Sequence, residues 1–463
     1  MNIDILNKKI AGKKVLILGF GKEGKSTYQF LRKYFKNQLF TIADNDINIR
    51  DKNTFDKNEN LEFILGDNYL ECIKDFELII KTPGISLKNL DKNLIKTLNI
   101  SSQTDIFLEL FAKQVIGITG TKGKSTTSSL IFNIIKSYTD NVILVGNIGI
   151  PPFELAEDIN NETIIVYEMS SHQLENIKVS PHISILLNIY QEHLDHYQSY
   201  KDYQMAKFNI AMYQNENDYF IYNTDNQEIN TLLNENSLKS QLIGFSLESE
   251  QKNGIFSANN NIYISENNST NVFYNTDSER FLKGEHNLLN IMAAIYACKL
   301  KNIPDENILY GIKNFKGLEH RIEFVGEYEN IRFYNDSIST IPEACIAAVN
   351  ALKEVDTLIL GGYDRGIDYS LLADFLIESE ISNLIFVGKA GERIFDEIKN
   401  LGCFNKAFYE ADSYEKIVET CFEVTQKGKI CLLSPAASSY DMFKNFEERG
   451  NKFKELIRKQ FNK

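Results

Sequence analysis

The chain has 463 residues, of which 43% are hydrophobic and 24% are charged, and no long Pro/Gly/Ser tract interrupts it. Because domains usually span about 100 to 200 residues, this length and composition predict an ordered protein of about three globular domains. Fifty basic and 63 acidic side chains give a formal charge of −13. A field of that sign repels phosphates, so a nucleic-acid partner is not expected and any bound phosphate must be held locally.

The cysteines and the N-terminus both indicate a reducing compartment. The six cysteines are scattered, without a C-x-x-C pair or the spacing of a zinc site or a disulfide framework. The first residues lead directly into a strand pattern, without the basic and apolar segments of a signal peptide. No run of about 18 apolar residues occurs. We therefore expect a cytoplasmic protein without a membrane span, and we expect a monomer.

Short apolar runs recur along the first half of the chain, each followed by a segment of helix length. They lie at residues 14–19, 40–44, 114–120, 141–146, 163–171 and 182–189. Continuous apolar runs are typical of parallel strands covered on both faces. Their alternation with helical segments predicts an α/β fold built on parallel sheets.

The second half adds an Asn-rich stretch and a third alternation of strands and helices. Short apolar islands at 248–278 predict antiparallel hairpins, which we expect to form a small peripheral sheet. Strand patterns at 331–336, 356–362, 383–388 and 429–435 predict a separate Rossmann-like unit. We place three domains at residues 1–103, 104–317 and 318–463, of which the first and third are Rossmann-like and the second carries a phosphate-binding loop.

The segment GITGTKGKSTT follows an apolar strand and precedes a helix, which is the context of a P-loop. Gly120 and Gly123 allow backbone N–H groups to turn toward phosphate oxygens, and Lys124 supplies a charge. Ser125 or Thr126 can bind Mg²⁺ through its hydroxyl group. Isoleucine takes the first glycine position of the common pattern, so the loop departs from that pattern in one place. The segment predicts binding of a nucleoside triphosphate.

A second glycine-rich turn, GFGKEG, follows the first strand, and Asp44 lies 20 residues after Gly24. Alone, this spacing predicts a dinucleotide site and an NAD(P)-dependent oxidoreductase. The same backbone geometry also serves the pyrophosphate of a UDP-sugar, and hydride transfer leaves the P-loop unexplained. A non-catalytic UDP-sugar sensor with a vestigial P-loop is a further alternative.

From the P-loop onward, a series of motifs resembles the Mur ligase family over essentially the whole chain. The motifs are ITGTKGKST, GNIG, EMSSHQLE, NIYQEHLDHY, GEHNLLN, GLEHR, YNDS and LLSPAASSYDMFKNFEERG. EMSSHQLE and the last motif resemble the D-glutamate-adding member, which disfavours other Mur ligases and folylpolyglutamate synthase. The resemblance implies ATP-dependent ligation of glutamate to UDP-N-acetylmuramoyl-L-alanine through an acyl phosphate, in cytoplasmic peptidoglycan precursor synthesis.

Activating a carboxylate with ATP requires that the charge on the transferred phosphoryl group be neutralised. Glu168 and His193 each follow a strand, so both can converge with Ser125 on Mg²⁺. The resemblance implies that Lys207 is carbamylated and also binds metal, whereas a plain surface lysine is the alternative. Lys124, Glu168, His193 and Lys207 form the predicted catalytic set.

The resemblance also implies contacts with the substrates. ATP would contact Gly120, Thr121, Lys122, Gly123, Lys124, Ser125, Thr126, Asn287, Arg321 and Asp336. UDP would contact Gly21, Lys22, Glu23, Asp44 and Gly84, and the muramoyl group would contact Asn147, Ser170 and Gln173. The incoming glutamate would contact Arg365, Ser439, Tyr440 and Phe446.

Three of the positions expected near glutamate depart from the family pattern. Ile338 and Arg365 replace lysines, and Tyr440 replaces a leucine. Losing an ammonium group weakens the binding of a carboxylate, although the planar guanidinium of Arg365 can form two parallel hydrogen bonds to one. D-glutamate is the predicted substrate, and the same reaction with L-glutamate stays open as an alternative.

Overall fold

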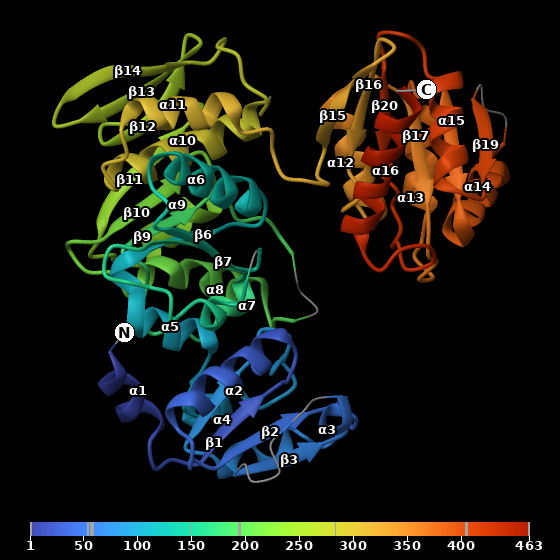
Figure 1. Ribbon diagram of the computed structural model, residues 1–463. Helices are drawn as coiled ribbons and strands as arrows, with labels where there is room; N and C mark the ends of the chain where they lie inside the picture. Colours follow the sequence, from blue (N-terminus) through green and yellow to red (C-terminus); the bar gives the residue numbers. More distant parts are fainter. Residues whose placement is uncertain are drawn as a thin grey trace. The chain divides into compact units, whose positions relative to one another are not determined.

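The computed structural model describes residues 2–52, 55, 60–148, 150–192, 196–282, 284–402 and 406–461. The chain divides into two compact units, Met1–Phe315 and Lys316–Lys463. Three sheets, each flanked by helices, confirm the predicted α/β fold class (Figure 1). The division of the first unit at residue 103 stays a prediction.

The first sheet has five strands in the order β3-β2-β1-β4-β5, and all of its paired neighbours are parallel. Its strands are β1 (Val15–Leu18), β2 (Phe40–Asp44), β3 (Leu61–Leu65), β4 (Leu78–Lys81) and β5 (Ile100–Ser101). Its helices are α1 (Ile3–Ile10), α2 (Lys22–Tyr34), α3 (Ile49–Lys52), α4 (Lys92–Thr97) and α5 (Gln103–Phe111). The four residues of β1 are all buried, as expected for a central parallel strand.

The second sheet has nine strands in the order β14-β13-β12-β11-β10-β9-β6-β8-β7. Its parallel part contains β6 (Val115–Thr119), β7 (Val142–Gly146), β8 (Ile164–Glu168), β9 (Ile183–Leu186), β10 (Tyr219–Asn223) and β11 (Gln241–Ser246). The Asn-rich stretch forms β12 (Gly254–Ala258), β13 (Asn261–Glu266) and β14 (Ser269–Asn275). These strands pair antiparallel with one another at the periphery, as predicted, and they extend the edge of this sheet because β12 pairs with β11.

In the described part of the chain, six α-helices accompany the second sheet. They are α6 (Lys124–Tyr138), α7 (Ser171–Leu174), α8 (Tyr200–Met212), α9 (Gln227–Glu235), α10 (Glu285–Leu300) and α11 (Asp305–Asn314). Helix α10 is apolar over most of its length, and its residues from Asn290 to Cys298 are all buried. It packs in one apolar cluster with α6 and the central strands, so α6 is held against a buried core through its residues from Leu130 to Ile135.

The second unit contains one sheet of six strands in the order β15-β16-β20-β17-β18-β19. Its strands are β15 (Glu323–Tyr328), β16 (Ile331–Asn335), β17 (Val355–Gly361), β18 (Asn383–Val387), β19 (Ala407–Ala411) and β20 (Ile430–Leu433). Its helices are α12 (Pro342–Leu352), α13 (Ser370–Glu378), α14 (Gly388–Leu401), α15 (Tyr414–Val424) and α16 (Phe446–Phe461). Separate apolar clusters cover the two faces, with α12 to α14 on one and α15 and α16 on the other.

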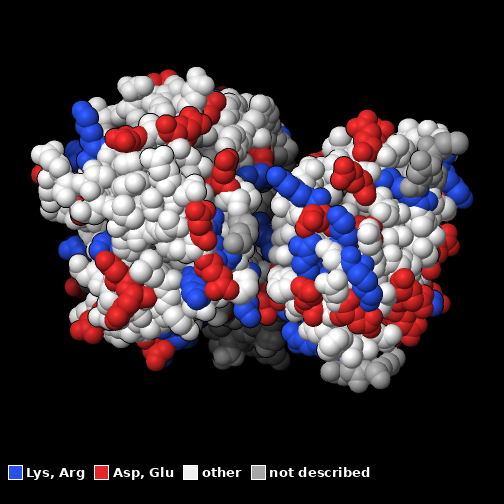
Figure 2. Space-filling model, turned by 90° about the horizontal axis from the view of Figure 1, so that it is seen from above, with Lys and Arg blue, Asp and Glu red and all other residues white. Residues whose placement is uncertain are grey.

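Two further features of the structure concern its surface charge and its helix lengths. On the face shown in Figure 2, acidic and basic side chains are interspersed on each unit, and no continuous basic surface is visible there. Among the residues that the structure describes, no helix is both long enough and apolar enough to cross a bilayer.

Because the second unit has its own sheet and two cores, we expect residues 316–463 to fold when expressed alone. The fragment should show one cooperative thermal transition by circular dichroism. Its matched control is Leu360→Asp, which places a charge at a fully buried position of β17 and should abolish the transition. A wild-type fragment without a cooperative transition would contradict the independence of this unit.

Candidate active site

The P-loop lies between β6 and α6, and two glycines allow it to pass close to neighbouring segments. Gly123 precedes α6 with a φ of +87°, and a Cβ added there would lie 2.5 Å from Oδ1 of Asn290. A Cβ at Gly120 would lie 3.0 Å from Cβ of Leu187. Side chains at either position would therefore push the loop outward. The N–H groups at the start of α6 point out of the helix terminus, which is the kind of site that binds phosphate.

Two lysine amines meet at one carbonyl of this loop. Nζ of Lys124 donates hydrogen bonds to the carbonyl oxygens of Gly120, at 2.8 Å, and Thr121, at 3.0 Å. Nζ of Lys207 donates to the same Gly120 oxygen at 2.9 Å. Burial, and then the charge of Lys124, lower the pKa of Lys207 well below that of an ordinary lysine. Lys207 is only 2% exposed, so the surface-lysine alternative is wrong.

The loop is fixed by contacts with the segment that follows β9. The hydroxyl groups of Thr121 and Tyr203 lie 2.9 Å apart, and the backbone N–H of Tyr190 donates to Oγ1 of Thr121 at 2.9 Å. The backbone N–H of Lys122 donates to Oδ1 of Asn188 at 2.8 Å. The loop conformation is therefore set by the protein itself, which lowers the cost of binding a ligand there.

Glu168 ends β8 close to the first turns of α6. Its carboxylate is fully buried and accepts hydrogen bonds from Nδ2 of Asn147, at 2.9 Å, and from the hydroxyl of Ser128, at 3.3 Å. It forms no ion pair with another described residue. The hydroxyl groups of Ser125 and Thr126 make no hydrogen bond within the described part of the chain. A buried carboxylate and available hydroxyls beside a P-loop fit a hard divalent cation.

The predicted metal set is only partly described. His193 lies outside the described residues. Within the described ranges, no group of three or more His, Cys, Asp or Glu side chains could hold a metal ion by itself. A cation at this place would therefore depend on phosphate oxygens as well as on protein ligands.

Ser170 and Gln173 make contacts that their predicted role did not anticipate. They form a capping box at the start of α7, in which each side chain bonds to the backbone N–H of the other. Nε2 of Gln173 also donates to Oε1 of Glu23 at 2.6 Å. Burial raises the pKa of Glu23, against the opposing effects of Gln173 and the charge of Lys81. Glu23 therefore links α2 to α7, and the muramoyl contacts of Ser170 and Gln173 stay predictions.

Part of the predicted UDP site lies together at the carboxyl end of the first sheet. An open hollow is lined by Phe20, Gly21, Lys22, Lys25, Asp44, Asp46 and Ile49. Asp44 accepts hydrogen bonds from the backbone N–H groups of Phe20, at 2.7 Å, and Asp46, at 2.9 Å. Its carboxylate therefore holds the rim of the hollow. Glu23 and Gly84 are not among the lining residues.

Lys81, at the end of β4, forms an ion pair with Glu175 that was not predicted. Nζ of Lys81 lies 3.0 Å from Oε2 of Glu175, and the Lys81 side chain is 2% exposed. Burial would raise the pKa of Glu175, but the hydrogen bond with His196 and the charge of Lys81 outweigh it and lower the pKa to about 2. The available signal was a lysine that ends the short apolar run LIIK, but this run was not among the predicted strands.

In the second unit, Asp336 follows β16 and is 1% exposed. It accepts hydrogen bonds from the backbone N–H of Ile322, at 3.1 Å, and from the hydroxyl of Ser434, at 2.7 Å. Burial raises the pKa of Asp336 to about 6, although hydrogen bonds from Ser339 and Ser434 act in the opposite direction. Arg321 lies one residue from this contact, so the structure brings these two predicted ATP contacts into one region.

The four residues predicted to contact glutamate differ widely in exposure. Ser439 is 3% exposed and Tyr440 is 66% exposed. Arg365 is exposed, and its Nη2 donates to the carbonyl oxygen of Thr340 at 2.9 Å. Phe446 begins α16. These positions stay predictions.

A residue without a predicted role organises this end of the unit. Arg449 is 1% exposed, and its Nε and Nη2 donate to the hydroxyl and carbonyl oxygens of Ser337 at 2.9 and 2.8 Å. The hydroxyl of Ser337 in turn donates to the carbonyl oxygen of Phe446 at 2.8 Å. The FEERG motif contains this arginine, but sequence alone does not indicate that it is buried.

Comparisons with known proteins found a family model and relatives that match the chain. Residues 118–298 match the family model described as Mur ligase middle domain. UDP-N-acetylmuramoylalanine--D-glutamate ligase of Clostridium tetani is 34% identical over 467 residues, covering 99% of this chain and 100% of that protein. The protein of the same name from Thermoanaerobacter sp. is 33% identical, covering 97% of this chain and 99% of that protein.

Solved structures support the fold. UDP-N-acetylmuramate-alanine ligase MurC from Thermotoga maritima has a TM-score of 0.54 and 16% identity, covering 97% of this chain and 100% of that one. MurF ligase from Thermotoga maritima in complex with ADP has the same TM-score and identity, covering 100% of this chain and 99% of that one. At this identity, the likeness concerns the fold alone.

Gly123→Ala tests the P-loop geometry. The added methyl group would meet Asn290, so we expect the loop to be displaced and the affinity for ADP to fall about tenfold or more. Isothermal titration calorimetry measures this affinity. Gly12→Ala is a matched control, because Gly12 also has a positive φ but has open space around it. Equal affinities for the two variants would contradict the assigned phosphate site.

Asp336→Asn tests the buried carboxyl group through the pH dependence of stability. The pKa in the folded state, about 6, is above the usual value, so folding favours the protonated form. This contribution is complete below about pH 4 and is lost as the pH rises through 6. Asparagine cannot ionise. Between pH 4 and pH 7 the unfolding free energy of the variant should therefore improve by about 2 kcal/mol relative to wild type. Urea unfolding of residues 316–463 measures this, and a pH-independent difference would contradict it.

Proposed function

The chain belongs to the Mur ligase family, and we propose that it joins D-glutamate to UDP-N-acetylmuramoyl-L-alanine at the expense of ATP. Relatives that cover nearly the whole chain at 32 to 34% identity carry the name of this activity. The observation that carries the proposal is the meeting of Lys124 and buried Lys207 at the carbonyl of Gly120. This contact joins the P-loop to a lysine whose pKa is lowered. Neither hydride transfer nor the binding of a UDP-sugar without catalysis requires two lysine amines at a phosphate-binding loop.

The proposed reaction has two steps. The alanine carboxylate of the UDP-substrate attacks the γ-phosphorus of ATP, a new P–O bond forms, and the bond to the β-phosphate oxygen breaks to release ADP. The glutamate amine then attacks the acyl carbon, phosphate leaves, and the nitrogen loses a proton. In the first step Lys124 would exchange its loop carbonyls for phosphate oxygens, while the N–H groups at the start of α6 bind the phosphate chain.

Ser125 and Glu168 would hold Mg²⁺, together with His193, which lies outside the described residues. The ion would neutralise charge on the phosphoryl group during transfer. Lys207 would join this metal-binding set as a carbamate. Its lowered pKa favours a neutral amine, which can add CO₂ to form an N–C bond with loss of one proton. The resulting carbamate would place an anion beside Gly120.

The UDP-substrate would occupy the hollow of the first sheet. Gly21 and Lys22, at the start of α2, would bind the pyrophosphate. Asp44 accepts two backbone hydrogen bonds, and because a carboxylate has about four acceptor positions it can also accept one from uracil. The alanine end would then extend toward the P-loop.

Glutamate would bind to the second unit near Arg365, Ser439 and Phe446. Arg365 can supply the cation that Ile338 no longer provides. Glutamate and ATP would bind to different units, and we infer that both must be bound before the amine can attack, with Arg321 among the groups that contact ATP. We infer a cytoplasmic protein, because its proposed substrates are ATP and a UDP-linked precursor, and a monomer would suffice, because each predicted substrate site is contained in this chain.

Phosphate release tests the proposal directly. The purified protein is given ATP, magnesium and UDP-N-acetylmuramoyl-L-alanine, with D-glutamate or L-glutamate offered separately. We expect sustained phosphate release with D-glutamate, because the relatives act on that isomer by name. Lys124→Ala is the control. It should fold, but it lacks the ammonium group that neutralises the phosphate charge, so it should release no phosphate. Turnover with L-glutamate alone would overturn the choice of isomer, and no turnover with either would overturn the proposed function.

A further inference from the structure

Arg321 lies in a turn whose backbone is unfavourable on both sides. His320 has a φ of +63° and Ile322 a φ of +47°, both in the left-handed region. Few residues other than glycine adopt this conformation, and a β-branched residue such as isoleucine is among the least suited to it. The turn therefore has to be imposed by its surroundings. Such imposed strain is a common property of groups that are held in place for function.

The contacts that impose the turn come from Glu323 and from the end of β16. The carboxylate of Glu323 accepts hydrogen bonds from the backbone N–H of His320, at 2.8 Å, and from Nδ2 of Asn335, at 2.9 Å. Nδ2 of Asn335 also lies 2.9 Å from Nδ1 of His320. Asp336 accepts from the backbone N–H of Ile322. Both amides that flank Arg321 are thus bound to carboxylates.

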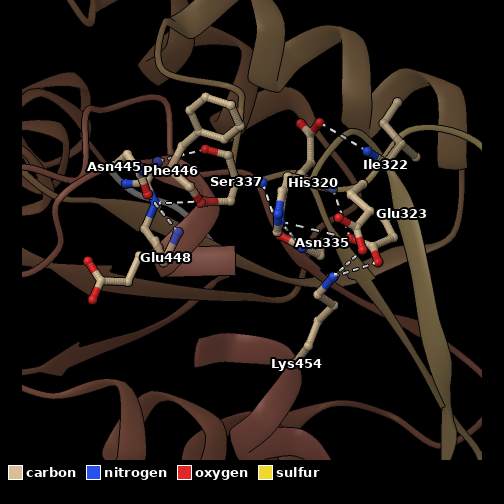
Figure 3. Close-up of polar contacts among 12 residues, drawn as sticks. His320, Ile322, Glu323, Asn335, Ser337, Asn445, Phe446, Glu448 and Lys454 are labelled. Carbon is tan, nitrogen blue, oxygen red and sulfur yellow. Dashed lines mark hydrogen bonds and ion pairs between the residues drawn. The ribbon is translucent and has the colours of Figure 1, made fainter. Parts of the chain in front are cut away.

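Helix α16 supports the same turn with one face. Phe446, Gly450 and Lys454 follow one another at intervals of four residues, so they lie along one side of the helix. Nζ of Lys454 lies 2.9 Å from Oε1 of Glu323, and Figure 3 shows this ammonium group directed at the carboxylate. A Cβ on Gly450 would lie 2.2 Å from Nδ1 of His320. The phenyl ring of Phe446 packs edge-on against His320, with the centroids 6.0 Å apart.

The ion pair between Lys454 and Glu323 is largely shielded from solvent. The side chains of Lys454 and Glu323 are 9% and 17% exposed. Pairs removed from solvent are less screened than surface pairs, and removing one partner leaves the other charge partly buried. Without Lys454, Glu323 would gain by turning toward water. It would then release the N–H of His320.

We propose that the Lys454–Glu323 pair, backed by Gly450 and Phe446 of α16, is a brace that holds the strained turn and so positions Arg321. Glu323 and Lys454 are positioning residues, because they act through the turn. The same face of α16 begins at Phe446, whose carbonyl oxygen is bound by Ser337. The brace therefore connects the turn that presents Arg321 to the segment expected to contact glutamate. Its kinetic consequence rests on the proposed function.

The test compares Lys454→Met with two other variants of the same helix. Lys454→Arg keeps a cation at the brace and serves as the conservative replacement. Lys452→Met is the matched control, because Lys452 pairs with Glu415 at 3.1 Å on the more exposed side of α16. Two quantities are measured on the full-length protein. The first is hydrogen exchange at the amides of His320 and Ile322, and the second is ATP-dependent phosphate release with the full set of substrates.

Lys454→Met should accelerate exchange at the His320 amide about tenfold, since the brace no longer holds the acceptor. It should also lower kcat about tenfold while leaving the affinity for the UDP-substrate unchanged, because that site lies in the first unit. Lys454→Arg should leave the exchange rate and kcat close to their wild-type values, and Lys452→Met should change neither.

Exchange at His320 that is unchanged in Lys454→Met would overturn the brace. Faster exchange with unchanged kcat would overturn its role in positioning Arg321. Weaker binding of the UDP-substrate in step with kcat would also overturn that role, since it would indicate a general structural defect. A wild-type protein without ATP-dependent turnover would overturn the proposed function instead, and the exchange measurement would still decide whether the brace exists.

Discussion

The carbonyl oxygen of Gly120 is the point on which the candidate site depends. It accepts hydrogen bonds from Lys124 and Lys207, so two amines that repel each other when charged are held at one atom. Burial and this repulsion favour the neutral form of Lys207. The arrangement requires glycine at 120 and 123, because side chains there would meet Leu187 and Asn290. Close packing of the loop thus sets the protonation of the site as well as its shape.

In the second unit, the candidate residues are held in place by other interactions than in the P-loop. Buried polar groups hold these residues, and the structure shows the unfavourable free energy that this requires. Asp336 has a raised pKa, and His320 and Ile322 occupy left-handed backbone conformations that each cost about 1 to 3 kcal/mol. A network of hydrogen bonds and one shielded ion pair offsets these costs. Stability is therefore given up locally where groups must be held in a fixed orientation.

The sequence predicted the fold class because apolar strands and glycine-rich turns are local signals. It did not predict β3, β4, β5, β10, β11, β15 or β19. For the last two the physical reason is plain, since EFVGEY contains a glycine and is only partly buried, and AFYEA is an edge strand with little buried surface. Gly123 and Lys124 belong to one contiguous motif and were predicted with it. The pairing of Lys454 with Glu323 spans 131 positions, so only the tertiary fold reveals it. Substrate contacts in both units stay predictions, because they depend on bound ligands.

Transfer of oxygen from the substrate carboxylate to phosphate tests the central claim most directly. UDP-N-acetylmuramoyl-L-alanine labelled with a heavy oxygen isotope in its alanine carboxylate is offered with ATP, magnesium and D-glutamate. If the carboxylate attacks the γ-phosphorus, the released phosphate carries one labelled oxygen, because the acyl C–O bond breaks when the amine enters. Mass spectrometry of the phosphate should find that atom. Unlabelled phosphate released in step with amide formation would contradict an acyl-phosphate ligase.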